Sequence, residues 1–249
     1  MKYLSKFFAI LFLTVLATGA RAQTGNPDAD NQLHNDLSLQ YLVHLPSRST
    51  SPPPVIILLH GMGSNEQDLY SLLPELPQKY AIISARAPYT LAEGSYQWFQ
   101  GTLVNNRLDG DPQQLAASRV RIGGFVDQVV TKYRLDPHQV YLVGFSQGAI
   151  LSYQVALTEP AKIRGIGVMS GAIFGSFVPL IKPSPALSHL RIFISHGQAD
   201  HRIPIGYALE ADQRLKGLGL KPEFHVYAGM QHEINSDALA DLVNWLRGS

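Results

Sequence analysis

Short apolar runs alternate with amphipathic stretches along most of the chain. Seven runs are rich in Val, Ile and Leu, and several are nearly unbroken; they are residues 39–45, 55–59, 81–84, 140–143, 163–169, 192–195 and 224–227. Nearly continuous apolar runs are typical of strands that are buried on both faces of a parallel sheet. The run at 39–45 is more mixed in polarity, which predicts a strand at the edge of the sheet.

Two longer stretches between these runs have the periodicity of helices. Within residues 115–134, apolar side chains from Ile122 to Tyr133 recur at spacings of four, three and four residues, which places an apolar stripe on one face. A second stripe, in residues 239–246, follows polar cap candidates at 235–237. The alternation of strands and helices predicts an α/β domain with a mostly parallel central sheet and helices on both faces.

The N-terminal segment has the layout of a secretory signal peptide. Lys2 and Lys6 precede an apolar run at residues 7–16, and the small-residue cleavage signal Ala20-Arg21-Ala22 follows. The run has about half of the roughly 20 apolar residues that a membrane-spanning helix needs. We therefore expect residues 1–22 to be removed and the mature protein to be periplasmic or secreted, with no stable membrane insertion.

The rest of the chain is predicted to form one domain. Residues 23–36 are polar and lack an apolar period, which predicts a flexible N-terminal tail. Residues 37–249 have the length of a single α/β domain. The connection at 172–189 is too long for an ordinary turn and mixes large apolar residues with prolines, so it is either a surface excursion or a lid or pocket wall. The sequence indicates no oligomeric state.

Composition excludes several classes of function. The chain has no cysteine, so it has no disulfides, thiolate metal site or cysteine nucleophile, and catalysis has to use oxygen or nitrogen groups. Its formal charge of +1 becomes −2 when the three basic residues of the leader are removed. A nearly neutral chain without blocks of like charge offers no electrostatic footprint for nucleic acid or anionic lipid.

The sharpest chemical signal is the G-x-S-x-G pattern of Gly144-Phe145-Ser146-Gln147-Gly148. It lies between the predicted strand at 140–143 and a helical stretch at 149–157. A serine on such a tight strand-to-helix turn projects its hydroxyl above the sheet, and the helix start directs amide hydrogens at developing negative charge. This context predicts that Ser146 is a nucleophile; the alternative is a Gly-rich turn with a solvated serine.

A serine nucleophile needs an imidazole base, and the base needs a partner that fixes its tautomer. In α/β-hydrolases the acid follows the serine and the histidine comes last. His232 has that place, in the loop after the strand at 224–227. Asp200 lies just beyond the strand at 192–195, at the edge where parallel sheets build their sites. Taken alone, Asp200 would be interpreted as a turn or capping residue.

The Gly-rich turn at residues 59–63 predicts half of an oxyanion hole. An oxyanion needs preorganised amide donors, and loss of one typically lowers the rate 100-fold or more. We predict that the amides of Met62 and Gln147 are these donors; a plain Gly-rich turn is the alternative. His60 in this turn, and His196 before the next strand-end glycine, are interpreted as residues that shape their loops.

Together these residues resemble the carboxylesterase/phospholipase family of α/β-hydrolases, which includes acyl-protein thioesterases and small bacterial carboxylesterases. The resemblance covers residues 54–246; its segments are 58–63, Asp68-Leu69, Ala87-Pro88, Trp98-Phe99, 144–148, Ser170-Gly171, 196–200 with Pro204, and 232–234. It implies an α/β-hydrolase fold, the catalytic roles given above, and hydrolysis of esters or thioesters without a cofactor or metal. It also implies that Trp98 and Phe99 line the substrate pocket, unless both are core aromatics.

Three residues depart from the pattern of that family. Gln231 and Ala149 stand where glycine is usual, and Gln100 stands where aspartate is common.

The predicted function is a serine hydrolase that cleaves small carboxylic esters through an acyl-enzyme. Export favours soluble esters, lysophospholipids or esterified glycans over thioacylated cytosolic proteins. The alternative is a non-catalytic hydrolase-fold module that binds an apolar ligand or an envelope partner.

Overall fold

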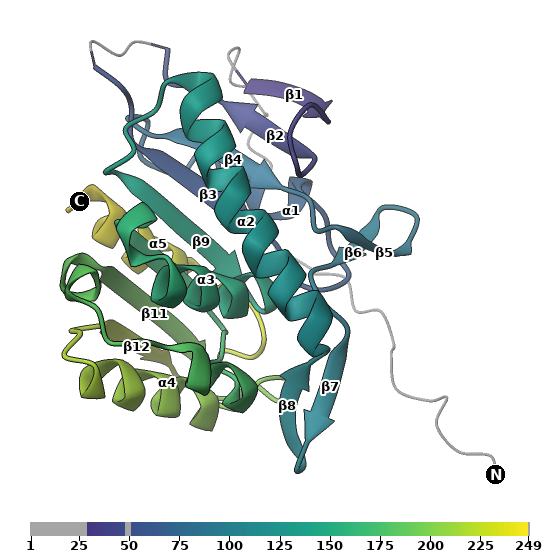
Figure 1. Ribbon diagram of the computed structural model, residues 1–249, viewed down its shortest axis with the longest axis vertical. Coiled ribbons are helices and arrows are strands. Elements are labelled where there is room, and N and C mark those ends of the chain that lie inside the picture. Colours follow the sequence, from purple (N-terminus) through teal and green to yellow (C-terminus); the bar gives the residue numbers. More distant parts are fainter. Residues whose placement is uncertain (1–28, 48–50, 249) are drawn as a thin grey trace.

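The computed structural model describes residues 29–47 and 51–248 (Figure 1). The predicted signal peptide, residues 1–22, lies outside the described residues, so the signal peptide and export stay predictions.

The flexible tail predicted over 23–36 is wrong for residues 29–34. They form strand β1 (Ala29–His34), which pairs antiparallel with β2 (Tyr41–His44). Backbone pairing at a sheet edge needs no apolar side chains, and this polar strand therefore leaves no hydrophobic period in the sequence.

Eight strands form one sheet in the order β1-β2-β4-β3-β9-β10-β11-β12. The other strands are β3 (Val55–Leu59), β4 (Ala81–Ala85), β9 (Val140–Phe145), β10 (Gly165–Met169), β11 (Arg191–Gly197) and β12 (Glu223–Tyr227). Every junction is parallel except those on the two sides of β2. All seven apolar runs form strands, and the mostly parallel sheet is confirmed. The edge position predicted for β2 is wrong, because β1 covers it.

Helices cover both faces of this sheet (Figure 1). They are α1 (Gln67–Tyr70), α2 (Pro112–Tyr133), α3 (Gln147–Thr158), α4 (Gly206–Gly217) and α5 (Ser236–Arg247). Apolar residues of α2, α3 and α4 belong to one core cluster, and those of α1 and α5 belong to a second. Alternate residues of β9 enter the two clusters: Leu142 lies in the first and Tyr141 in the second. Among residues 29–47 and 51–248, no helix has the length and apolar character needed to cross a bilayer.

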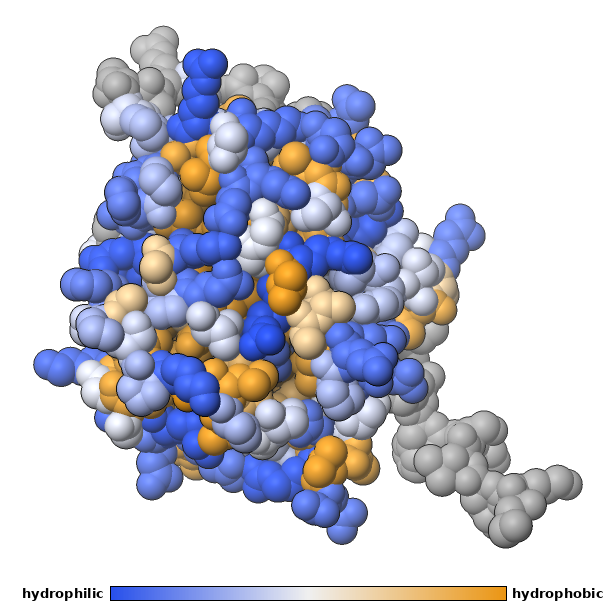
Figure 2. Space-filling view, viewed as in Figure 1, coloured by the Kyte–Doolittle hydropathy of each residue, from blue (hydrophilic) through white to orange (hydrophobic). Residues whose placement is uncertain are grey.

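Two hairpins separate β4 from α2 and project from one side of the molecule (Figure 1). They are β5 (Tyr89–Ala92) with β6 (Ser95–Gln97), and β7 (Gly101–Val104) with β8 (Arg107–Gly110). The β7–β8 tip carries Leu103 and Val104, which are 66% and 51% exposed, and Figure 2 shows apolar surface at that end. Contacts with α4 hold the hairpin: Arg107 pairs with Glu210 at 2.6 Å, and the Tyr207 hydroxyl accepts from Leu108 N at 2.8 Å.

The long connection at 172–189 is a packed segment. It contains two 3₁₀ helices, η2 (Gly175–Leu180) and η3 (Pro185–His189). Phe174 is buried and meets the Phe99 ring edge-on with 5.9 Å between centroids. The Ser176 hydroxyl donates to Asp109 Oδ1 of β8 at 2.6 Å. This segment therefore packs against Phe99 and the β7–β8 hairpin, and a role as a lid or pocket wall stays a prediction.

Candidate active site

Ser146 occupies a strained turn between β9 and α3. Its backbone has φ 54° and ψ −115°, outside the regions that residues with a Cβ favour, and α3 begins at the next residue. The Ser146 amide donates to Met169 O of β10, and its carbonyl accepts from Ile150 N, both at 3.0 Å. Because both sides of the turn are held, the partly exposed hydroxyl stays at the carboxyl edge of the sheet.

Side chains that follow three different strands form one chain of hydrogen bonds. His232 Nε2 lies 2.9 Å from Ser146 Oγ, and His232 Nδ1 lies 2.7 Å from Asp200 Oδ2. An ionised carboxylate only accepts, so Nδ1 carries the hydrogen and Nε2 accepts from the serine hydroxyl. The structure thus brings together the three residues that the sequence predicts as nucleophile, base and acid.

Asp200 is held by its own loop beyond β11. Its Oδ1 accepts from the amides of Arg202 and Ile203, both at 2.9 Å. The His196 imidazole lies beside it, donating through Nε2 to Ile203 O at 2.7 Å and lying 3.5 Å from Asp200 Oδ2. Burial raises the pKa of Asp200, but the hydrogen bond and charge of His232 and the two amides outweigh burial and hold that pKa below its usual value. The carboxylate that orients the imidazole is therefore ionised at neutral pH.

The loop that carries His232 packs against the end of β11. Ala199 N donates to Met230 O at 3.0 Å. A Cβ on Gly197 would lie 2.2 Å from Met230 O, so glycine is needed for this close approach. The Phe145 ring packs on the imidazole of His232, with 4.9 Å between centroids. These contacts fix the histidine against the nucleophile turn.

The two amides that the sequence predicts as oxyanion donors lie on loops that meet beside Ser146. Gln147 begins α3, and within the described part of the chain neither its amide nor that of Met62 has an acceptor. A Cβ added to Gly61 would lie 3.4 Å from Ser146 Cβ, so the first loop packs against the serine. Both N–H groups are therefore available to an oxyanion formed there. Their role in the reaction stays a prediction.

The Gln147 side chain ties the nucleophile turn to the segment after β6. Its Oε1 accepts from Trp98 N at 2.9 Å, and its Nε2 donates to Phe99 O at 2.8 Å. Trp98 Nε1 in turn donates to His60 O at 2.9 Å. The side chains of Trp98 and Phe99 are buried, at 0% and 1% exposure. The prediction that these rings line the pocket does not hold for this structure; both are core aromatics, and the hydrogen bonds of their residues join the loop of His60 to the turn of Ser146.

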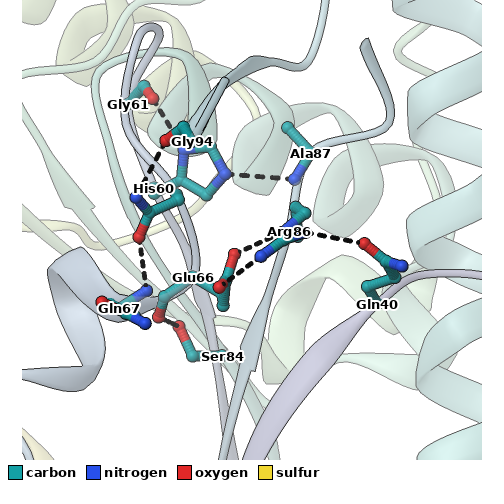
Figure 3. Close-up of polar contacts among 10 residues, drawn as sticks. Gln40, His60, Gly61, Glu66, Gln67, Ser84, Arg86, Ala87 and Gly94 are labelled. Atoms are coloured by element: carbon teal, nitrogen blue, oxygen red, sulfur yellow. Dashed lines mark hydrogen bonds and ion pairs between the residues drawn. The ribbon is translucent and has the colours of Figure 1, made fainter. Parts of the chain in front are cut away.

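An ion pair fixes the loop at 60–66 from the other side. The buried Glu66 carboxylate accepts from Arg86 Nε at 2.5 Å and from Arg86 Nη2 at 2.6 Å (Figure 3). The Arg86 guanidinium also lies 4.5 Å from the centre of the Tyr96 ring, and Tyr96 O accepts from Gly63 N at 2.8 Å. Burial raises the pKa of Glu66, but the hydrogen bonds from Arg86 outweigh it and hold that pKa below its usual value.

Sequence reasoning missed this ion pair and the clamp made by the Gln147 side chain. Glu66 and Arg86 carry opposite charges, but they follow β3 and β4, and only the structure shows that these strands are neighbours in the sheet. The partners of Gln147 are backbone atoms, so no side-chain pattern points to them. His60 and His196 do contact the loops that the sequence predicts they shape.

Acidification is expected to destabilise the fold through His60. Burial lowers the pKa of His60 from 6.5 to about 4, so between these values the unfolded chain binds the proton and the folded chain does not. Stability therefore falls as the pH falls, by roughly 3 kcal/mol over this range. Burial also lowers the pKa of His196, which acts in the same direction. Urea unfolding at pH 7, 5.5 and 4.5 tests this. His60→Gln, which cannot be protonated, should lose less stability with acid, and an equal loss in both proteins would contradict the assignment.

Most of the chain matches a known protein family. The sequence model described as Phospholipase/Carboxylesterase matches residues 44–249. The chain belongs to the phospholipase/carboxylesterase family. It is thereby a member of a family of α/β-hydrolases that act on esters, and the α/β-hydrolase fold is confirmed.

Proteins from distant organisms match most of the chain. Acyl-protein thioesterase 1 of Saccharomyces cerevisiae is 31% identical over 229 residues, covering 82% of this chain and 94% of its own. Lysophospholipase-like protein 1 of Mus musculus is 26% identical, covering 82% and 92%. The crystal structure of a carboxylesterase from Mesorhizobium loti has a TM-score of 0.73 at 21% identity, covering 88% of this chain and 99% of its own. That structural likeness shows the fold alone.

The departure from the family at Gln231 is accommodated without strain. Gln231 is exposed, and it is not among the described residues with positive φ. Its amide approaches Glu233 Oε1 at 3.4 Å. Because the backbone there suits a residue with a Cβ, the glycine usual in the phospholipase/carboxylesterase family is not required to place the histidine that follows.

Proposed function

We propose that this protein is a serine hydrolase that cleaves small carboxylic esters through an acyl-enzyme, with Ser146, His232 and Asp200 as its catalytic triad. The observation that carries the proposal is the continuous chain of hydrogen bonds from Asp200 through His232 to Ser146. Those bonds leave the unprotonated Nε2 of the imidazole facing the hydroxyl that it has to deprotonate.

The proposed reaction has two steps that use the same residues. His232 takes the proton of Ser146 as the hydroxyl oxygen attacks the ester carbonyl, and the oxyanion binds the amides of Met62 and Gln147. His232 then returns the proton to the leaving alcohol, which gives the acyl-enzyme. Water enters, loses a proton to His232 and releases the acid, and the proton returns to Ser146. Asp200 remains ionised throughout and stabilises the imidazolium.

The proposed substrates are soluble carboxylic esters, including lysophospholipids. The yeast relative is named an acyl-protein thioesterase, and the mouse relative is named a lysophospholipase-like protein. Export, if the leader at residues 1–22 functions, separates this enzyme from cytosolic thioacylated proteins and favours esters outside the cytosol. A binding module without catalysis is the second candidate. The intact hydrogen-bonded triad disfavours it, because in a protein without catalysis mutational drift normally removes at least one of three residues that act as a unit.

Covalent labelling distinguishes the enzyme from the binding module. A fluorophosphonate probe is expected to form one adduct per chain, on Ser146, because the imidazole activates only this hydroxyl. Intact mass and peptide mapping measure the stoichiometry and the site, and urea-denatured protein is the control that should stay unlabelled. Absence of an adduct on Ser146 in the folded protein, together with no turnover of p-nitrophenyl acetate, would favour the binding module.

A further inference from the structure

The peptide unit between Gly61 and Met62 is anchored through its carbonyl oxygen. Gly61 O accepts from His60 Nδ1 at 2.7 Å and from Ser64 N at 3.3 Å. On the other side of the same imidazole, Nε2 lies 3.1 Å from Ala87 N (Figure 3). An amide N–H only donates, so Nε2 is the acceptor, and the hydrogen on Nδ1 is donated to Gly61 O.

Anchoring this carbonyl also fixes the direction of the Met62 N–H. The peptide bond is planar and trans, so the C=O and N–H of one unit point in opposite directions. A hydrogen bond to the carbonyl polarises the unit and makes its N–H a stronger donor. Because Gly61 packs against Ser146, with 3.4 Å between an added Cβ and Ser146 Cβ, the oriented N–H belongs to a unit beside the nucleophile.

His60 is itself held rigidly. It is fully buried, and its ring lies 5.6 Å from the Trp98 ring, whose Nε1 donates to His60 O. Its second partner, Ala87, directly follows Arg86, which the ion pair with Glu66 keeps in place (Figure 3). Burial lowers the pKa of His60 to about 4, so at neutral pH the imidazole is uncharged and keeps one donor and one acceptor.

We propose that His60 is a positioning residue for ester hydrolysis, which holds the Gly61–Met62 peptide so that the Met62 N–H meets the oxyanion. This inference rests on the proposed function, because it assigns the Met62 amide to the oxyanion hole. His60 touches no reacting atom; it acts through the peptide that it anchors.

Two amide variants separate the two hydrogen bonds of the imidazole. In His60→Asn, Nδ2 takes the position of Nδ1 and still donates to Gly61 O, but the acceptor for Ala87 N is lost. In His60→Gln, Oε1 takes the position of Nε2 and still accepts from Ala87 N, but the donor to Gly61 O is lost. We expect His60→Gln to lower kcat about 100-fold and His60→Asn to stay within about tenfold of the wild type, with KM changed less than about threefold in both.

Three readouts decide the outcome. The affinity of a phenylboronic acid, whose tetrahedral adduct places an oxygen in the oxyanion hole, should fall with kcat in His60→Gln, while thermal unfolding shows similar destabilisation of both variants. Equal kcat in the two variants, or kcat that follows stability alone, overturns the role of His60. Side-chain ¹⁵N NMR of the wild type needs no variant: a hydrogen on Nε2 in place of Nδ1 would also overturn it. Failure of the proposed function is seen separately, as wild-type protein without turnover or a Ser146 adduct.

Discussion

Replacing Ser146 by alanine is expected to lower kcat for p-nitrophenyl butyrate by about 10⁴- to 10⁶-fold while the protein stays folded. The change removes the hydroxyl that is bonded to His232 Nε2, and with it the acyl-enzyme route; the oxyanion hole and substrate binding alone leave a small residual rate. Only one oxygen is lost, from a partly exposed side chain, so the free energy of unfolding should change by less than about 1 kcal/mol. Steady-state kinetics and thermal unfolding of the purified variant measure the two effects.

Ser170 provides a matched control for that substitution. It follows β10, the neighbour of β9, and its φ of 52° is close to the 54° of Ser146. Its buried hydroxyl has no hydrogen-bond partner among the described residues. Ser170→Ala should therefore keep kcat within about threefold, since it removes a hydroxyl from the same kind of backbone without touching the imidazole. An equal loss of kcat in the two variants would show that the effect of Ser146→Ala does not come from the hydroxyl beside His232.

Most of the strands that the sequence predicts correctly are buried along their whole length; β12, which has no buried residue, is the exception. Every residue of β3 and β9 is buried, so each strand is an unbroken apolar run. That property depends on the presence of helical layers above and below and not on which strand lies alongside. The order of the strands leaves no such trace, and so the sequence does not reveal that β1 covers β2 or that β4 lies between β2 and β3.

The hairpins could not be predicted because they lack a buried face. All four residues of β7 are exposed, and three of the four in β5 are. Alternation of apolar and polar residues arises only where one face of a strand is buried. The β7–β8 hairpin is fixed instead by backbone pairing and by polar contacts with α4, which leave no periodic pattern.

Some features of the candidate site could also be predicted from the sequence, and others could not. Ser146, Asp200 and His232 could be placed because each follows a recognisable strand, and the carboxyl ends of parallel strands meet at one edge. The direction of an aromatic ring has no comparable signal, since Trp98 and Phe99 are equally suited to a pocket wall and to the core. Both residues are buried and their backbone is bonded to the Gln147 side chain, which only tertiary structure shows.

Gly148→Ala is expected to destabilise the protein by more than about 4 kcal/mol or to prevent folding. A Cβ at this position would lie 1.9 Å from Leu59 O and 2.5 Å from Leu59 C, and both are backbone atoms that no rotamer change can move aside. Relief of the clash requires α3 to move away from β3. Because Leu59 leads into the loop of Met62, and Gly148 follows the amide of Gln147, the same movement separates the two oxyanion donors, and we expect kcat to fall in any protein that does fold.

Gly124 is the matched control, because it is also a helical glycine, in α2, but has no atom within 4 Å of an added Cβ. Gly124→Ala should raise the free energy of unfolding by about 0.5–1 kcal/mol, since alanine restricts the unfolded chain and favours the helix. The same change from glycine to alanine is therefore expected to lower the free energy of unfolding at position 148 and to raise it at position 124, and guanidinium unfolding of the two variants measures both effects. A free energy of unfolding of Gly148→Ala within about 1 kcal/mol of the wild-type value would contradict this prediction. It would show that the close contact of α3 with β3 does not require glycine at position 148.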